Sequence, residues 1–280
     1  MTSDVLNQIE EGIRRGDVVP YLGPGALAGV TNVATGAPIP ATSDELILAM
    51  NNGSPMAPRL MYEFPRAAMN VELKRGRSYL NRFLNTTYGE TVWTESPLHR
   101  WLFELGAPYI VDVNRDTGLQ KLYAATPHTL IVGLARIAGT DFRFRLYSHD
   151  GERYRAATED GIDPDVPILF KPLGTPLPQA DYIASDADFV DYITELMGGF
   201  GIPAFLKRLR IGKQYALLGL RLQRDTERMV MSDIIYGAGK PAGWALIPDP
   251  NDKERRFCSR LGLDIVQADA AELLREPSAA

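Results

Sequence analysis

Short apolar runs and helical stretches alternate most regularly in residues 215–266, which read YALLGLRLQRDTERMVMSDIIYGAGKPAGWALIPDPNDKERRFCSRLGLDIV. Apolar runs this short are typical of buried strands, and apolar residues recurring at a spacing of three to four are typical of amphipathic helices. We therefore expect strands over 215–220, 243–247 and 263–266, and helices over 225–235 and 252–261. Alternation at this period predicts an α/β fold with a mostly parallel sheet covered by helices on both faces.

The rest of the chain extends the same pattern less regularly. Strands are expected over 18–22, 109–113 and 166–171, and the runs 128–132 and 142–147 can also be strands. Helices are expected near the N-terminus and over 43–50, within 57–87, and over 97–105, 186–197 and 203–209. A last helix is expected to end at Leu274. In parallel sheets, ligands bind beyond the carboxyl ends of the strands. The loops at Gly23, Asn114, Gly174 and Gly219 are expected to lie at that edge.

Composition limits the classes of function. The chain has 280 residues, of which 45% are hydrophobic and 23% charged, so a disordered or fibrous protein is excluded. A net charge of −5 argues against nucleic-acid binding by bulk charge. No apolar run reaches the roughly 18 to 20 residues that span a bilayer, and the N-terminus lacks the pattern of a secretory signal. We therefore expect a soluble cytoplasmic protein.

Cysteine and histidine are scarce in this chain. Cys258 is the one cysteine, which excludes an internal disulfide framework and a cysteine-based zinc cluster. The three histidines, His99, His128 and His149, lie far apart in the sequence. We expect no metal site, and we expect His99, near the start of a helix, to be a packed or capping residue.

A glycine turn, Gly23-Pro24-Gly25, follows the first expected strand. This is the context of a phosphate-binding turn, in which glycines let the backbone approach an anion and free amides at a helix start hold it. The same residues also suit a tight turn without a ligand, and Pro24 removes one backbone donor. The turn alone does not separate these two interpretations.

Five segments taken together resemble, in order and spacing, the sirtuins and their divergent bacterial relatives. The segments are Leu6 to Ala26 with 37–46 after it, 97–100 leading into 108–116, 167–174, 182–189 and 217–225. They resemble the family's G-A-G loop and G-x-P segment, its P-x-x-H and T-T-N-Y-D motifs, its K-L-H-G motif, its T-x-x-D-Y helix start and its F-L-G-Y-S-L-x-D loop. Asn114 and Asp116 match the polar anchors of T-T-N-Y-D. The resemblance covers about residues 5–267.

The resemblance implies one sirtuin-like domain over residues 1–280 with a Rossmann-like fold, a helical insertion at about 50–95 and an irregular one at about 120–165. It implies NAD, or an ADP-ribose-like nucleotide, as the ligand, with Asn114 and Asp116 as catalytic residues. The implied cofactor-binding residues are Gly23, Pro24, Gly25, Ala26, Asn114, Gly174, Gly219 and Arg221. Because Cys258 is alone, the four-cysteine zinc ribbon of deacetylating sirtuins is missing, so we do not expect a histone-type deacetylase.

The chain departs from this family at residues that carry its chemistry. Leu173 stands where the family has the histidine that acts as a base on the nicotinamide ribose, and a general base contributes about 10²- to 10⁴-fold to a rate. His149 can replace that base only if its loop folds over the site. Asp112 is expected near the diphosphate and would repel it, unless Arg115 or another cation compensates. Leu27 replaces the serine of the glycine loop.

These observations leave three functions open. The first is a catalytically degenerate sirtuin-like protein that binds NAD or a related adenine nucleotide, as a sensor or in an assembly. The second is an active NAD hydrolase of the bacterial antiviral-defence type, which releases ADP-ribose and nicotinamide. The third is a structural interaction protein without a ligand, favoured if Leu27, Arg115 and Leu173 fill the pocket. A homo-oligomer or a protein partner stays open in each case.

Overall fold

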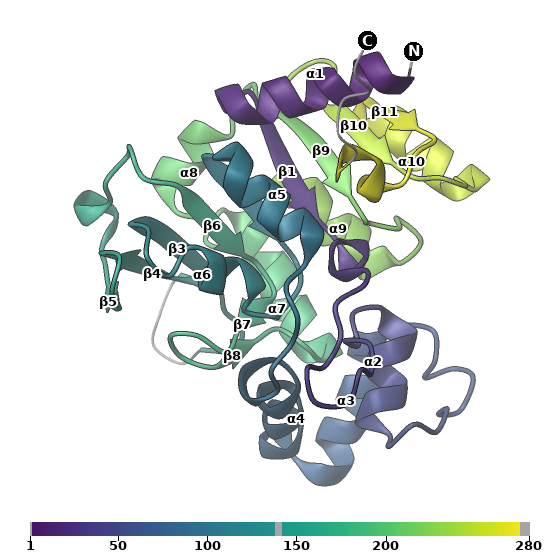
Figure 1. Cartoon of the computed structure of the whole chain (residues 1–280). Coiled ribbons are helices and arrows are strands. Elements are labelled where there is room, and N and C mark those ends of the chain that lie inside the picture. The colour runs from purple at the N-terminus through teal and green to yellow at the C-terminus, as the bar shows by residue number, and fades with distance from the viewer. Residues whose placement is uncertain (1, 138–141, 275–280) are drawn as a thin grey trace.

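A nine-stranded sheet forms the centre of the molecule (Figure 1). The computed structural model describes residues 2–137 and 142–274. The strand order is β11-β10-β9-β1-β2-β6-β3-β4-β5, in which the strands from β11 to β3 run parallel and β4 and β5 add an antiparallel edge. The strands are β1 Val18–Leu22, β2 Tyr109–Asp112, β3 His128–Gly133, β4 Phe144–His149, β5 Tyr154–Ala156, β6 Ile168–Lys171, β9 Gln214–Leu218, β10 Gly243–Leu246 and β11 Leu263–Val266. Two residues each form β7 (Gly174–Thr175) and β8 (Asp181–Tyr182), a separate antiparallel pair.

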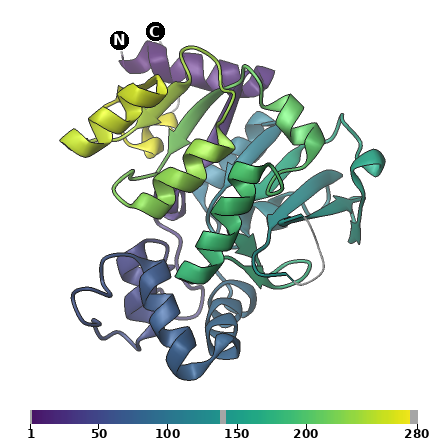
Figure 2. The same ribbon diagram turned by 180° about the vertical axis from the view of Figure 1, so that it is seen from behind.

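Helices cover both faces of this sheet, as the alternation predicts, so the α/β Rossmann-like fold is confirmed. On one face lie α1 (Thr2–Arg15), α5 (Pro97–Leu105) and α6 (Gly118–Leu122), together with a 3₁₀ helix, Ala270–Leu274. On the other face, seen in Figure 2, lie α7 (Asp186–Gly198), α8 (Ala204–Leu209), α9 (Asp225–Ile234) and α10 (Asp252–Leu261). In the described residues, no helix is both long and apolar enough to cross a membrane.

The central strand β1 shows why the sequence pattern of this sheet is uniformly apolar. All five of its residues are buried, because both faces of the strand are covered. Val18 and Leu22 belong to the hydrophobic core on the α1 side, whereas Val19 and Tyr21 belong to the core on the α9 side. Pro20 pairs with β9, but the register with β2 begins only at Tyr21, so the proline lies where one flank of the strand has no ladder.

A third layer of helices lies beyond the carboxyl edge of the sheet (Figure 1). It consists of α2 (Ser43–Met50), α3 (Phe64–Arg75) and α4 (Arg77–Asn85), followed by a π-helical turn, and it has its own hydrophobic core. Pro65 lies in the first turn of α3, where its missing N–H costs no helical hydrogen bond, so it begins this helix and does not break it. Gly76, at φ +82°, separates α3 from α4.

The segment 120–165, expected to be irregular, contributes three strands. Strand β3 pairs in parallel with β6, and β4 and β5 follow it as an antiparallel meander. Residues 138–141 of this segment lie outside the described residues. The apolar run 130–132 is fully buried between helices, so it behaves as a central strand and not as part of an insertion loop.

Candidate functional site

The loops that follow β1 and β9 meet at the carboxyl edge of the sheet. Beyond these loops, the chain after β1 continues to α5 on one face of the sheet, whereas the chain after β9 continues to α9 on the other face, which is the arrangement at the ligand-binding edge of doubly wound folds. The Gly23 N–H donates to the carbonyl of Leu218 at 2.9 Å, and the Gly25 N–H donates to the carbonyl of Gly219 at 2.8 Å. The predicted glycine loops are therefore brought together.

Close backbone packing explains these glycines. Gly219 has φ +66°, and a Cβ on Gly25 would lie 2.7 Å from the Gly219 Cα. The N–H of Ala26 donates to the Gly23 carbonyl at 3.0 Å, so the amides of residues 23, 25 and 26 all have partners within the protein. This turn has the tight form that the sequence left open, and an anion placed there would find those three donors already engaged.

Two adjoining cavities lie at this edge of the sheet. The inner cavity, with a volume of about 70 Å³, is lined by Tyr21, Phe64, Asn114, Leu173, Arg224 and Glu227 among others. The outer cavity, of about 350 Å³, is lined by Gly25, Ser43, Gly219, Arg221, Arg224 and Glu227 among others. The two share five lining residues, which are Pro24, Ser43, Leu220, Arg224 and Glu227. Together they form one cleft that runs from the end of β9 to the end of β2.

The volumes of the two cavities decide what each can hold. An apolar cavity of about 150 Å³ accommodates a benzene molecule, so the inner cavity is too small for a nicotinamide ring in this conformation. The outer cavity falls within the usual range of about 300 to 1,000 Å³ for ligand pockets. Leu173 and Arg115 contribute to the narrow inner wall, whereas Leu27 lines a different cavity.

Asn114 acts as a link between two loops. Its Nδ2 donates to the Gly23 carbonyl and to Asp112 Oδ1, both at 2.9 Å, and its backbone N–H also donates to that Asp112 oxygen. These bonds fix the loop after β2 against the loop after β1. Asn114 also lines the inner cavity. It therefore lies at the cleft, as the sequence predicted, and at the same time holds the two loops together.

Of the two alternatives left open for Asp112, compensation by Arg115 or by another cation, the structure shows the second. The Arg115 guanidinium is buried against the Phe64 ring and donates to the carbonyl of Ile183, and burial lowers the pKa of Arg115. The cation that neutralises Asp112 is Lys171, whose Nζ lies 2.6 Å from Asp112 Oδ2. Lys171 lies on the neighbouring strand β6, and the sequence pattern of that strand did not indicate that its ammonium pairs with Asp112.

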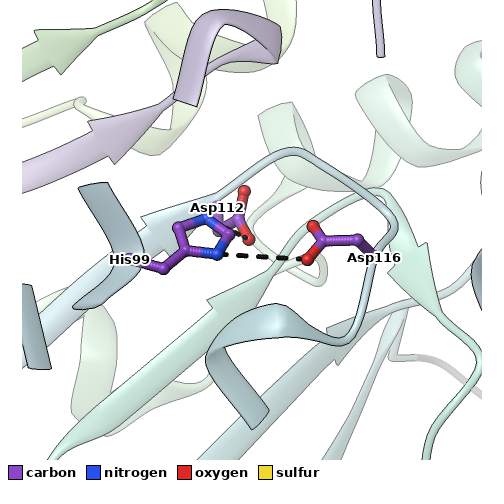
Figure 3. Close-up of side chains that lie close together, drawn as sticks. All are labelled: His99, Asp112 and Asp116. Carbon is purple, nitrogen blue, oxygen red and sulfur yellow. Dashed lines mark ion pairs between the residues drawn. The ribbon is translucent and has the colours of Figure 1, made fainter. Parts of the chain in front are cut away.

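His99, Asp112 and Asp116 lie close together in the interior (Figure 3), and Lys171 completes this buried cluster through ion pairs with both carboxylates. The His99 Nε2 lies 4.0 Å from Asp112 Oδ2, and its Nδ1 lies 4.0 Å from Asp116 Oδ2. Burial would raise the pKa of Asp116, but Lys171, His99 and the Gly118 N–H together lower it. Asp116 therefore stays ionised and faces this cluster, and it lines neither the inner nor the outer cavity.

The same cluster contains the donor set that a metal ion would use. His99, Asp112 and Asp116 each offer one ligand atom within 4.8 Å of the others, and imidazole with carboxylates suits zinc or manganese. The Lys171 ammonium, however, already lies 2.6 Å from Asp112 and 3.6 Å from Asp116. A divalent ion would be repelled by that charge, so the residues fit an internal ion cluster better than a metal centre.

A cavity of about 400 Å³, here called the back cavity, borders this cluster on the α5 side. It is lined by Leu27, Trp93, His99, Arg100, Asp116 and Gly118 among others. Within the described residues, both ring nitrogens of His99 lack hydrogen-bond partners. The His99 backbone N–H donates to Ser96 Oγ at 3.2 Å, so the residue lies in the capped first turn of α5, as expected.

Glu227 and Arg224 lie where the two cavities of the cleft join, and the sequence did not single out either residue. Burial raises the pKa of the Glu227 carboxyl to about 7, and nearby Glu63 adds to the rise, against lowering by Arg224 and Arg228. The Glu227 Oε2 is buried without a hydrogen-bond partner among the described residues. Acidic residues in a first helical turn are common, so the sequence held no signal for this site.

Arg224 has no ion pair within the described part of the chain, although its guanidinium lies 4.9 Å from the centre of the Tyr62 ring. Arg221, which the resemblance implied as a cofactor-binding residue, is already bonded to other protein groups. Its guanidinium pairs with Glu254 at 2.9 Å and 3.1 Å and also donates to the Asp249 carbonyl. The cation free to meet an anionic ligand at the cleft is therefore Arg224.

The remaining predicted residues do not line the cleft. Gly23, Ala26 and Gly174 do not line the inner or outer cavity in the described structure. His149 lies in β4, where its ring stacks on His128 with a centroid distance of 4.6 Å, and it lines neither cavity. Of these two side chains, the carboxylate of Glu227 lines the inner cavity with Leu173 and the imidazole of His149 does not.

Two comparisons with known proteins identify no similar protein or family. A scan against protein-family models finds no match, and a search of curated proteins finds none either. The resemblance to sirtuins stays a prediction that rests on the order of the motifs.

Proposed function

We propose that this protein binds an adenine nucleotide, such as ADP-ribose or NAD, in the outer cavity, and that it does not hydrolyse NAD. The observation that carries the proposal is the cleft at the β1 and β9 ends, with an unpaired Arg224 at the junction of its two cavities. Arginine binds phosphate with charge-assisted hydrogen bonds. The nucleoside would lie in the outer cavity and its phosphates against Arg224.

The same cleft argues against hydrolysis. Removing nicotinamide from NAD requires the nicotinamide ribose to enter the catalytic pocket, and the inner cavity of about 70 Å³ is smaller than that ring. Leu173 lines this cavity at the position where the resemblance implies a histidine base. An apolar side chain accepts no proton, so general-base assistance from this position is lost.

The binding claim is tested by isothermal titration calorimetry with ADP-ribose, NAD and ADP. We expect all three to bind, and Arg224→Gln to weaken binding about tenfold, the effect of losing one charged hydrogen bond. Arg66→Gln is the matched control, because Arg66 lies over the same Tyr62 ring but lines neither cavity. Equal affinities in both variants, or no binding heat in the parent protein, would refute the proposal.

NAD hydrolysis is a second candidate, because Glu227 lines the inner cavity together with Asn114 and burial raises its pKa to about 7. A carboxylate of that pKa can take the proton from a water that attacks the ribose C1′, as nicotinamide leaves. Incubation with NAD and measurement of free nicotinamide separates the two candidates. We expect no release from the parent protein, and release of nicotinamide would favour this second candidate over the first.

A further inference from the structure

Glu227 occupies the junction of the cleft with an unsatisfied acceptor. It lies in the first turn of α9 and lines both the inner and the outer cavity. Its Oε2 is buried and has no hydrogen-bond partner among the described residues. A buried polar atom without a partner is costly, and at a ligand cavity the missing partner is supplied by the ligand.

The chemistry of this partner follows from the groups around Glu227. Glu63, at the start of α3, is buried, and its Oε2 accepts from Thr226 Oγ1 at 3.1 Å. Tyr21 of β1 lines the inner cavity together with Glu227, and Arg228 is occupied by the carbonyls of residues 222 and 223 and by Asp225. Two neighbouring carboxyls disfavour a further negative charge, whereas hydroxyl groups can donate to a carboxylate.

We infer that Glu227 binds the hydroxyls of the adenosine ribose and thereby selects nucleotides whose ribose carries no phosphate. This inference rests on the proposed nucleotide binding, and it assigns recognition of the adenosine ribose to the carboxylate of Glu227. The outer cavity is large enough for a nucleoside, and it is lined both by Glu227 and by Arg224, against which the phosphates would lie. A 2′-phosphate would bring a second anion against Glu227 and Glu63.

Calorimetry on the parent protein at pH 8, above the raised pKa of Glu227 so that the carboxyl is ionised, gives the first test, which needs no variant. ADP-ribose is compared with its 2′-phosphorylated form, and ADP is compared with 2′-deoxy-ADP. We expect the 2′-phosphorylated ligand to bind at least about tenfold more weakly than ADP-ribose, and 2′-deoxy-ADP to bind about tenfold more weakly than ADP. Equal affinity within each pair would overturn the inference.

Variants then assign the discrimination to Glu227. In Glu227→Gln the preference for ADP-ribose over its 2′-phosphorylated form should fall below about threefold, because the repelling charge is gone. Asp225→Asn is the matched control, since it removes a carboxylate from the same helical turn whose side chain is 63% exposed and lines neither cavity. It should keep the parent's preference.

The outcomes distinguish this inference from the proposed function. If ADP-ribose binds and its affinity depends on Arg224, but Glu227→Gln keeps the full discrimination, only the role of Glu227 is refuted. If no adenine nucleotide binds to the parent protein, both the proposed function and this inference are refuted. Circular dichroism of each variant confirms that a loss of binding is not a loss of fold.

Discussion

Replacing Glu227 by glutamine should change how the stability of the protein depends on pH. Burial raises the pKa of this carboxyl in the folded protein to about 7, against a reference value of 4.5. The folded protein therefore holds a proton that the unfolded chain releases between about pH 4.5 and pH 7. The free energy of unfolding of the parent falls across this interval, and above pH 7 the loss is complete.

The magnitude follows from the two pKa values. A difference of one pKa unit corresponds to about 1.4 kcal/mol, so the interval from 4.5 to about 7 corresponds to about 3 kcal/mol. Solvent reaches part of the Glu227 side chain, which reduces the expected effect to about 2 kcal/mol. Glutamine does not titrate, so Glu227→Gln should gain about this much stability over the parent between pH 4.5 and pH 8.

Urea unfolding, followed by circular dichroism at pH 5 and at pH 8, measures this difference. Other groups also titrate over this range, but they contribute equally to the parent and to the variant, so the difference between the two proteins isolates Glu227. The control is again Asp225→Asn, which removes an exposed carboxylate. If the difference between Glu227→Gln and the parent were the same at both pH values, the burial argument for Glu227 would be wrong.

Three further perturbations test other parts of the structure. Lys171→Met should lower the free energy of unfolding by about 3 to 5 kcal/mol, because it leaves the buried Asp112 carboxylate without its cation. Adding Asp112→Asn should recover part of that loss, as measured by urea unfolding. Burial lowers the pKa of His128 to about 4, so its imidazole should stay neutral above pH 5 in an NMR titration, and stability should decline as the pH falls from about 6.5 towards 4. A midpoint near pH 6.5 would contradict its buried position. Gly219→Ala should lower stability by about 1 to 3 kcal/mol, because a Cβ there would lie 2.5 Å from the Ala26 nitrogen at a positive φ, and an unchanged melting temperature would refute this.

The sequence predicts individual elements of this fold well where each has its own boundary signals. Helix α10 begins at a capping box in which Asn251 and Glu254 bond to each other's backbone, and it ends at Gly262 in the left-handed conformation. Such signals act within four residues, so a local pattern contains them. The order of the strands is not local. Nothing in the apolar run 130–132 says that it pairs with β6, because any buried strand has the same composition.

The candidate site divides in the same way. The sequence predicted that Asn114 and Gly23 would lie at the same edge of the sheet, because both follow parallel strands, and their hydrogen bond of 2.9 Å agrees with this. It did not predict the pairing of Asp112 with Lys171, which joins two strands 59 residues apart in sequence. Glu227 and Arg224 were missed because each has an ordinary local explanation, as a helix-start acid and as a surface arginine.

The glycines and Asn114 that carry the resemblance all have structural partners, and this weakens their value as markers of chemistry. Gly23 and Gly25 bond to the loop after β9, and Asn114 bonds to Gly23, so this edge of the sheet requires these residues whether or not a ligand binds. A residue that the fold already satisfies does not distinguish a binding protein from a structural one. Arg224 and Glu227 are the residues to test, since within the described chain the first lacks an ion pair and the second has a buried oxygen without a partner. Ligand affinity should therefore respond to these two side chains.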